Sequence, residues 1–537
     1  MNLQYVAKLN TFIYPPCNGN DKKSLLGADR RVVEMEDGQI LVPNDHRTLQ
    51  TLIASGVPVG MPMVDYDWPI APGRQPWRVQ KLQANFQVLY PYAMNLSDMR
   101  TGKTLSSLWA ADYIMRRESN VKCLIVCQLS TTRRTWGDAI FENFLGRRRF
   151  AILTGSPQRR LRELDRDVDF YVINYEGLAI GKRGRKAKLE FTGLSGAIEQ
   201  RSDIQICIID EASAYRNPAT DRHDVARHLL VGRRYLWLLT GTPTPQAPTD
   251  AYGLAKLVNN ADGQSFTAFK HRTMVQVSSF KWVSRPEARK VVYNLLQPAI
   301  RITQEQCFDA TELVHMSRQA ELSAEQVKQY RELKHQLTIQ LRDHKGDPRQ
   351  VDAVNQAALR SKLIQIACGA VYDQEHFAHF LDARPRLAVL EEVIRECPHK
   401  WIVFAPLTSV LKLISTHLTS LKLSHTVIDG KVTGAERDKR LKDFMGKDGP
   451  VGLVAHPGPI ARGLDFSAAS TIVWYAPTDI PEDYTQANER INGPAQKHLR
   501  TVVHIGATLP EWEIYRRLKD KASLQGAILK LLEKEEE

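Results

Sequence analysis

Cysteine is scarce in this chain: the 537 residues include only seven, and these are scattered along its length. This spacing excludes a disulfide framework and the paired C-x-x-C pattern of a zinc site, and it fits a reducing cytoplasm. Cys123 and Cys127, in the stretch VKCLIVC, fall on one face of an expected strand among aliphatic residues. We therefore expect both to be buried core thiols rather than metal ligands.

Long apolar runs are missing as well. No run approaches about 18 residues, the length that a membrane-spanning helix requires. The first residues, MNLQYVAKLNTF, lack the long apolar core and the cleavage site of a secretory signal. We also find no short repeat. The sequence therefore predicts a cytoplasmic protein without a membrane anchor or membrane partner.

Acidic residues are outnumbered by basic ones. The chain has 73 Lys and Arg against 60 Asp and Glu, a formal net charge of +13. This excess favours a polyanionic partner, although basic surfaces also occur in proteins that bind no nucleic acid. Hydrophobic residues make up 43% of the chain and charged residues 25%, as in a soluble protein with real cores. At about 150 residues per domain, the length predicts three or four globular units.

The pattern of apolar segments divides the chain into four parts. Residues 1–75 are expected to form an N-terminal accessory domain that ends in a Pro/Gly-rich linker. In residues 76–300 and 385–537, short apolar strands alternate with amphipathic stretches, which predicts two α/β lobes with parallel, helix-covered sheets. The expected strands are CLIVC, FAILTG, DFYVINY, IQICIID and YLWLLTG, then WIVFAP, HTVIDG, VGLVAH, STIVWYA and TVVHIG. Helical spacing predicts a connecting region over 301–384 and a helix at the C-terminal end.

The tripeptide Gly102-Lys103-Thr104, in SDMRTGKT, ends like a phosphate-binding loop. In such a loop the glycine lets the backbone approach a phosphate, the lysine reaches the β- and γ-phosphates, and the threonine hydroxyl binds Mg²⁺. The complete pattern has a glycine five positions earlier, where this chain has Ser97. By itself the tripeptide is also compatible with a surface turn.

A second polar cluster follows an expected buried strand, since IQICIID ends in Asp210 and Glu211 comes next. Open parallel sheets bind ligands beyond the carboxyl ends of their strands. In phosphoryl transfer one carboxylate can hold Mg²⁺ while another orients or activates the attacking water. The alternative is an exposed acidic turn. A third strand exit, LLTGTPTPQ, places Thr242 in a loop that could sense a neighbouring site, or in a plain turn.

The order of these motifs resembles that of the Swi/Snf-like DNA-dependent ATPases, a branch of helicase superfamily 2, over residues 76 to about 530. In the first block the similar stretches are PWRVQKLQANF, MRTGKT, LIVCQLSTTRRTW, VINYE, DEASAYRN and LTGTPTPQ. In the second they are IVFAP, DGKVTGAERDKRLKDF and RGLDFSAASTIVWYAPTDIPEDYTQANERI. The resemblance implies two RecA-like lobes, and the chain resembles compact members from bacteria or phages.

The resemblance also implies roles for individual residues. The expected catalytic residues are Lys103, Asp210, Glu211 and Arg490, and the expected Mg²⁺ ligands are Thr104 and Asp210. The expected ATP-binding residues are Gln80, Gly102, Lys103, Thr104, Gly463, Asp465 and Gln486. Gln80 stands where the family reads adenine, and Arg490 where an arginine reaches the γ-phosphate.

Three positions depart from the family's pattern. Arg100 stands where glycine is usual, and its side chain is expected to point out of the loop because a left-handed turn disfavours arginine. Gln128 lies near the usual place of a proline. Gly493 replaces the second of two arginines in the last motif. Since an arginine finger can contribute roughly 10³ or more in rate, Gly493 predicts slow hydrolysis unless Lys497 or Arg462 substitutes.

A translocase holds duplex DNA mainly through backbone phosphates. Three basic clusters could serve, GRRRF, QRRLR and GKRGRKAK, and we favour a solvated charge run for the first. The expected DNA contacts are Lys182, Arg183, Arg185 and Lys186 in the last cluster, Thr131 from the family resemblance, and Thr242. No aromatic pair interleaved with basic residues stands out as a stacking platform, which favours duplex over single-stranded DNA.

The sequence therefore predicts a motor on double-stranded DNA that uses ATP and Mg²⁺. It would remodel forked or branched DNA or displace bound proteins in a bacterial or phage-infected cytoplasm. Two alternatives stay open: a superfamily 2 RNA helicase, and a nucleotide-gated DNA-binding scaffold that hydrolyses ATP weakly. The pattern identifies no protein partner and no role for residues 1–75.

Overall fold

The computed structural model describes residues 3–184, 189–278, 281–307, 313–343, 360–373, 375, 377–430, 432, 434–460, 466–492, 496 and 498–532. The chain divides into two compact units, Met1–Cys307 with Gln525–Glu537, and Phe308–Leu524, and each is described by itself. Among the described residues, no helix combines the length and the apolar character needed to cross a membrane.

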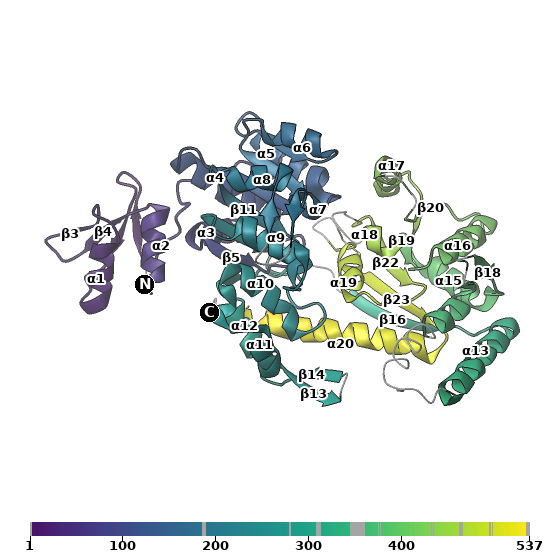
Figure 1. Ribbon diagram of the computed structural model, residues 1–537. Helices are drawn as coiled ribbons and strands as arrows, with labels where there is room; N and C mark the ends of the chain where they lie inside the picture. The colour runs from purple at the N-terminus through teal and green to yellow at the C-terminus, as the bar shows by residue number, and fades with distance from the viewer. Residues whose placement is uncertain are drawn as a thin grey trace. The chain divides into compact units, whose positions relative to one another are not determined.

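The first unit contains a seven-stranded parallel sheet (Figure 1). We call this sheet, together with the helices that cover it, lobe 1. In spatial order the strands are β15 (Ala299–Ile300), β5 (Tyr92–Asn95), β12 (Tyr235–Leu239), β11 (Ile204–Asp210), β6 (Lys122–Cys127), β8 (Phe170–Asn174) and β7 (Phe150–Leu153). Every neighbouring pair is parallel. The central strands are nearly continuous apolar runs because helices cover both faces of the sheet.

Helices follow almost every strand of lobe 1. They are α3 (Arg78–Leu89), α4 (Lys103–Arg117), η1 (Thr132–Gly137), α5 (Asp138–Phe144), α6 (Pro157–Leu164), α7 (Tyr175–Leu178), α8 (Gly193–Gln200), η3 (Ala212–Tyr215), α9 (Asp221–Leu230), η4 (Pro248–Asp250), α10 (Ala251–Val258), η5 (Asn260–Gly263), α11 (Phe266–Thr273) and α12 (Ala288–Leu295). Cys123 and Cys127 lie in the core beneath α4 and η1, so the prediction of buried thiols is confirmed. Burial raises the pKa of both.

The second unit contains lobe 2, a six-stranded sheet in which every pair is again parallel. The strands are β16 (Leu313–Gln319), β23 (Arg500–Gly506), β22 (Ala469–Trp474), β19 (Lys400–Phe404), β21 (Gly452–Ala455) and β20 (His425–Ile428). The helices are α15 (Arg384–Glu396), α16 (Thr408–Ser420), α17 (Gly434–Met445), α18 (Pro457–Ile460), α19 (Pro481–Glu489) and α20 (Leu509–Leu532). A fully buried ion pair, Arg386 with Glu511 at 2.7 Å, joins α15 to α20.

Between β16 and β19 of lobe 2 the chain is mainly helical where it is described. It forms α13 (Ala324–Asp343), a helix over 360–368, and the hairpin of β17 (Ala370–Tyr372) and β18 (Ala378–Phe380). The predicted fold class, two parallel-sheet α/β lobes with helical insertions and a small N-terminal domain, is confirmed. All ten quoted strands form, and the sequence pattern missed β5, β15 and β16.

The N-terminal domain is a four-stranded antiparallel sheet with two helices and a core of its own. The strands are β1 (Gln4–Val6), β2 (Thr11–Tyr14), β4 (Ile40–Pro43) and β3 (Val33–Glu34), and the helices are α1 (Gly19–Ala28) and α2 (His46–Ala54). The Pro/Gly-rich segment that follows packs on lobe 1 as a strap. Its Met63 and Tyr66 belong to the lobe 1 core, and the Tyr66 hydroxyl donates to Asp112 at 2.6 Å.

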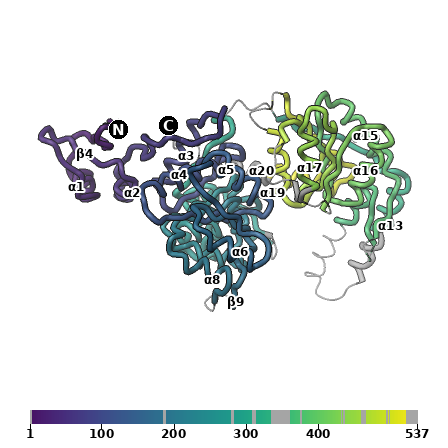
Figure 2. Tube along the Cα trace, turned by 90° about the horizontal axis from the view of Figure 1, so that it is seen from above, coloured from purple at the N-terminus to yellow at the C-terminus, as the bar shows by residue number. Residues whose placement is uncertain are grey.

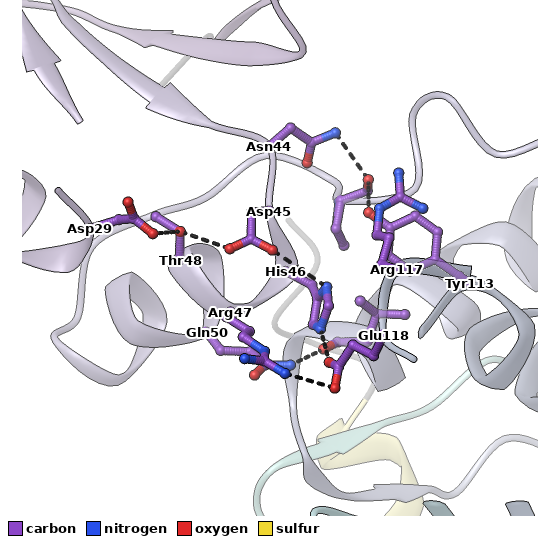
Figure 3. Close-up of polar contacts among 12 residues, drawn as sticks. Asp29, Asn44, Asp45, His46, Arg47, Thr48, Gln50, Tyr113, Arg117 and Glu118 are labelled. Atoms are coloured by element: carbon purple, nitrogen blue, oxygen red, sulfur yellow. Dashed lines mark hydrogen bonds and ion pairs between the residues drawn. The ribbon is translucent and has the colours of Figure 1, made fainter. Parts of the chain in front are cut away.

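A buried polar contact joins α2 to the end of α4 (Figure 3). The His46 Nε2 lies 2.7 Å from the Glu118 carboxylate, and Arg47 donates to the other carboxylate oxygen at 2.8 Å. The side chains of His46 and Glu118 are only 1% and 8% exposed. Burial pushes the pKa of Glu118 up, but the hydrogen bonds from His46 and Arg47 and the charge of Arg234 outweigh it and hold this pKa at about 2.

Replacing this carboxylate should weaken the docking of the N-terminal domain. Glu118→Ala leaves His46, Arg47 and Arg234 without their shared partner, and we expect a loss of about 3 kcal/mol in unfolding free energy. The partner variant Arg47→Ala should cost less than about 1 kcal/mol, because Arg47 is 59% exposed. Denaturant unfolding and hydrogen exchange in α2 measure both effects. Equal losses in the two variants would contradict this role of Glu118.

The same pair predicts an acid dependence. Because the pKa of Glu118 is about 2 in the folded chain and ordinarily 4.5, its contribution is complete above about pH 4.5. That contribution is lost as the pH falls from about 4.5 toward 2. Glu118→Ala should therefore remove part of the acid sensitivity of α2, and unchanged sensitivity would contradict the assignment.

Candidate nucleotide-binding site

The loops that carry the chemical motifs of lobe 1 begin at the carboxyl ends of three neighbouring strands, β5, β12 and β11. These three strands end at the same position in the sheet. In the register of the sheet, Leu239 of β12 pairs with Asn95 of β5 on one side and with Asp210 of β11 on the other. The loop before α4, the loop after β12, and Glu211 are therefore neighbours at the carboxyl edge, where ligands of parallel sheets bind.

Gly102 fits the position of a phosphate-contacting glycine. It caps α4 in the left-handed conformation, with φ +83°. A Cβ atom at this position would lie 2.2 Å from the amide nitrogen of Gln80, so only glycine fits against that side chain. The first backbone N–H groups of α4 and the positive end of its dipole favour an anion here. The arrangement brings Gln80 of α3 and the loop into direct contact.

Lys103 lies along this loop. Its ammonium group donates to the carbonyl oxygens of Ser97 at 2.7 Å and Asp98 at 2.6 Å. Burial lowers the pKa of Lys103, and the charges of Glu211, Asp98 and Asp210 oppose that shift. The cation and the two motif carboxylates therefore share one electrostatic environment, as a site for a metal-bound triphosphate requires.

The unusual Ser97 has a structural role. Its side chain is buried, and its hydroxyl accepts a hydrogen bond from the backbone N–H of Ile302 at 3.0 Å. Arg301 donates to the Leu96 carbonyl at 2.8 Å and to the Asp98 carboxylate at 2.7 Å. The segment after β15 thus braces the loop from behind, which explains why a serine can stand where the complete pattern has glycine.

Arg100 adopts the left-handed conformation that glycine would favour. Its φ is +63°, and a residue with a Cβ atom pays about 1–2 kcal/mol for that conformation. The backbone therefore takes the conformation that disfavours arginine, and the outward direction of the side chain stays a prediction. The loop keeps the backbone of a glycine at this position, because the contacts of Ser97 and Asp98 fix its path on one side and α4 fixes it on the other.

Arg100→Gly should consequently stabilise the protein. We expect an increase of about 0.5–1 kcal/mol in unfolding free energy, because relief of the left-handed strain exceeds the added entropy of the unfolded chain. Arg100→Ala is the matched control: it removes the same side chain but keeps the Cβ atom. Denaturant titration of the two variants decides the point, and an equal change in both would show that φ is not the cause.

Aromatic side chains position the acidic pair. The indole N–H of Trp136 donates to the Asp210 carboxylate at 2.9 Å, and the Tyr175 hydroxyl donates to the Asp210 carbonyl at 2.6 Å. Glu211 has φ +46°, so the chain turns sharply where the strand ends. Trp136 and Tyr175 were not predicted from the sequence as parts of this site. Both stand in stretches quoted for the family resemblance, which was the available signal.

The loop after β12 lies close to the loop before α4. A Cβ atom at Gly241 would lie 3.4 Å from the Ser97 carbonyl oxygen, so the two loops approach at their backbones. Thr242 is buried, and its backbone N–H donates to the Thr240 hydroxyl at 3.1 Å. A change in one loop can therefore be passed to the other through direct packing.

The residues expected to contact DNA have varied surroundings. The Thr131 hydroxyl is buried and donates to the Gln128 carbonyl at 3.0 Å. Lys182 pairs with Asp221 at 2.8 Å, and Arg183 is exposed in the short strand β9 (Lys182–Arg183), labelled in Figure 2. Arg185 and Lys186 lie outside the described residues. These contacts stay predictions.

The arginines of GRRRF and one arginine of QRRLR are engaged within lobe 1. The arginines of GRRRF pair with aspartates, as Arg147 does with Asp67 at 2.8 Å and Arg148 with Asp169 at 2.9 Å. Arg160, of QRRLR, is buried and donates to the Asn174 side chain at 2.9 Å. The paired arginines of GRRRF hold the strap and the edge of the sheet together, which differs from a freely solvated charge run.

The lobe 2 residues of the expected site are partly described. Arg490 follows α19 and is buried, and its carbonyl accepts from the Phe466 N–H at 3.0 Å. Gln486 is fully buried within α19. Outside the described residues lie Gly463, Asp465, Gly493, Arg462 and Lys497. The geometry above is therefore that of lobe 1 alone.

Comparison with known families identifies the class of protein. The sequence profile of the SNF2-related domain matches residues 95–368, and that of the helicase conserved C-terminal domain matches residues 385–492. The chain belongs to the SNF2-related family and is a DNA-dependent ATPase with a helicase-type core. The resemblance to the Swi/Snf-like branch of superfamily 2 is confirmed.

Individual relatives span a wide range of sizes. A protein called p41 from Acyrthosiphon pisum secondary endosymbiont phage 1 is 25% identical, and the match covers 81% of this chain and 94% of the phage protein. Chromodomain-helicase-DNA-binding protein 1-like from Danio rerio is 23% identical over 60% of this chain, which spans only 32% of that protein's length. The resemblance to compact phage members therefore holds, whereas the relative from Danio rerio is about three times as long as the region matched.

A solved structure, the SWI2/SNF2 ATPase core of Sulfolobus solfataricus in complex with double-stranded DNA, is 19% identical. The match covers 87% of this chain and 96% of that one, with a TM-score of 0.38. The strand order described above, and not this similarity, defines the fold.

Proposed function

We propose that this protein is an ATP-driven translocase on double-stranded DNA, which uses Mg-ATP hydrolysis to remodel forked or branched DNA or to displace bound proteins. One observation carries the proposal most directly. Lys103, Asp210 and Glu211 meet at the carboxyl edge of three adjacent strands, so a cation for phosphate and two carboxylates share one site.

Each residue of lobe 1 has a defined part in this proposal. Gln80 lies against the loop and would recognise the adenine base, while Gly102 and the first N–H groups of α4 cradle the phosphates. Lys103 would exchange its two carbonyl acceptors for phosphate oxygens. Glu211 would orient the attacking water, since the sharp turn at this residue sets its side chain beyond the strand end.

The side chains present fit Mg²⁺. Asp210 offers a carboxylate and Thr104 a hydroxyl, which are the hard oxygen ligands that this ion prefers. The indole of Trp136 fixes the orientation of the carboxylate through its hydrogen bond at 2.9 Å. When bound, Mg²⁺ would neutralise charge on the β- and γ-phosphates. Trp136 thereby acts as a positioning residue for Asp210.

Lobe 2 would complete the site. In the proposal Arg490 stabilises charge on the γ-phosphate, and Gly463, Asp465 and Gln486 contribute further nucleotide contacts. Opening and closing of the lobes with each ATP would move the protein along the DNA backbone. Thr131, Thr242 and the basic loop with Lys182, Arg183, Arg185 and Lys186 would supply phosphate contacts of lobe 1.

Displacement of a third strand from a triplex tests translocation without strand separation. We expect ATP-dependent release of the third strand from a linear duplex, and greater turnover on forked than on linear DNA. Structured RNA should not substitute for duplex DNA. Release that needs no ATP, or turnover stimulated by RNA alone, would reject the proposal.

A nucleotide-gated DNA-binding protein that hydrolyses ATP slowly is the second candidate. The observation that favours it is Gly493, which stands where the family's second arginine is expected. Such a protein would change its affinity for DNA when ATP binds, yet its hydrolysis would stay near background at saturating duplex DNA. The triplex assay separates the two, because a switch releases no third strand.

A further inference from the structure

A basic β-hairpin extends from lobe 1 beyond the helices that carry it (Figure 1). It consists of β13 (Met274–Ser278) and β14 (Lys281–Ser284), paired antiparallel, between α11 and α12. Residues 266–293 contain six Lys and Arg against a single acidic residue, Glu287. None of the motifs discussed above includes this segment, and the charge excess is far above that of the chain as a whole.

The cations of this hairpin module, residues 266–293, differ from those of the GRRRF cluster in what they contact. Within the described part of the chain, five of them form no ion pair with a carboxylate: Lys270, Arg272, Arg285, Arg289 and Lys290. The contacts found are with neutral groups, such as Arg272 to the Gln264 amide oxygen at 2.7 Å. By contrast, Arg147 and Arg148 are neutralised by aspartates. Unneutralised cations are the ones that can replace the counterions of a polyanion.

Apolar side chains on the strands of the hairpin are also exposed to solvent. Val275, Val277 and Val283 are exposed, Val277 by 56%, although isolated two-stranded ribbons are only marginally stable in water. A two-stranded ribbon fits the major groove of B-form DNA, where apolar side chains can contact thymine methyl groups. Exposed valines between cations therefore match the chemistry of a DNA groove flanked by phosphates.

The aromatic residue of the hairpin favours duplex over single-stranded DNA. The ammonium group of Lys270 lies 3.8 Å from the centre of the Trp282 ring, and His271 packs edge-on against the same ring. The ring is thus occupied in holding basic side chains at the base of the hairpin. A stacking platform for unpaired bases would need an open aromatic face.

We propose that the module of residues 266–293 is a second duplex-DNA contact of lobe 1, in which the ribbon enters a groove and the cations bind the flanking phosphates. The inference rests on the proposed action on double-stranded DNA and adds a binding surface separate from the nucleotide site. It gives the motor a contact that does not depend on the loops at the carboxyl edge.

The salt dependence of duplex binding tests the phosphate contacts. The triple variant Arg272→Gln, Arg289→Gln and Lys290→Gln removes three exposed cations, and each lost phosphate contact lowers the slope of log affinity against log salt by about one. We expect a slope lower by about three in the full-length protein. The control variant Lys8→Gln, Arg30→Gln and Arg227→Gln removes three exposed cations elsewhere in the first unit and should leave the slope nearly unchanged.

A photocrosslinking residue at Val277 provides a measurement that does not depend on charge removal. It should crosslink to duplex DNA, whereas the same residue at Leu145, which is 72% exposed in lobe 1, should not. Equal slopes in the triple variant and the wild type, or no crosslink from Val277, would overturn the inference; a hairpin that binds another protein gives this result. If the wild-type protein neither binds duplex DNA nor hydrolyses ATP faster in its presence, the proposed translocase function is wrong. If the wild-type protein does bind duplex DNA but the two hairpin tests fail, only the inference about the hairpin is wrong.

Discussion

Lys103→Ala is expected to lower the DNA-stimulated rate of ATP hydrolysis by about a hundredfold or more. Lys103 is the first residue of α4, and its ammonium group contacts the preceding loop within the electrostatic reach of Glu211 and Asp210. Loss of one preorganised donor to a developing negative charge typically costs about 10²–10³ in rate. Steady-state hydrolysis at saturating duplex DNA measures the effect.

The fold should survive this change. Burial lowers the pKa of Lys103, so its charge costs desolvation energy in the folded chain, and alanine imposes no such cost. Lys256→Ala is the matched control, because the ammonium group of that lysine in α10 donates to the Asn260 side chain at 2.6 Å, at an exposed position. A Lys103→Ala protein that melts normally and hydrolyses ATP at the wild-type rate would exclude this loop as the phosphate site.

Glu211→Gln is expected to separate ATP binding from hydrolysis. The substitution keeps the shape of the side chain and the left-handed turn at φ +46°, but it removes the carboxylate that we propose orients the attacking water. General acid–base groups contribute about 10²–10⁴ in rate. The single-turnover rate should therefore fall by about that factor while the dissociation constant for ATP changes little.

Two comparisons make the Glu211 result specific. Asp210→Asn should weaken Mg-dependent ATP binding as well as hydrolysis, because this carboxylate is the proposed metal ligand. Glu142→Gln, at a half-exposed residue of α5 that pairs with Arg74, should change neither quantity. If Glu211→Gln weakened ATP binding as strongly as Asp210→Asn, the proposed division of roles between the two carboxylates would be wrong.

Much of the fold could be predicted because its central strands are buried on both faces. The stretches CLIVC, IQICIID and YLWLL are continuous apolar runs, and these became β6, β11 and β12. The strands that were missed carry a weaker signal. β5 has the sequence YAMN, β15 has only two residues, and β16 (LVHMSRQ), at the edge of its sheet, ends in three polar residues.

The candidate site could be predicted only in part. Lys103, Asp210 and Glu211 follow strands or open a helix, so their residue types and positions identify them directly. The contacts by which Arg301 supports the loop before α4 could not be predicted from residue type and position. Arg301 and Leu96 are 205 positions apart and come into contact only when the sheet assembles. Trp136 was hidden for the same reason, since its partner Asp210 lies 74 positions further on.

The hairpin shows a different limit of sequence reading. Lys270 and Trp282 stand twelve positions apart, and only the antiparallel pairing of β13 and β14 brings them together. A local scan for aromatic and basic residues side by side therefore passed over this segment. Ion pairs between residues far apart in the sequence are also seen only in the structure. GRRRF is more densely basic in sequence than the hairpin, yet its arginines form ion pairs with Asp67, Asp112 and Asp169.

The most direct test of the central claim is the rate of ATP hydrolysis by the purified full-length protein, measured with and without linear duplex DNA. We expect hydrolysis that requires Mg²⁺, rises at least about tenfold when duplex DNA is added, and falls by about 10²–10³ in Lys103→Ala, as for loss of a preorganised donor. A rate that is unaffected by duplex DNA in the wild-type protein would contradict it.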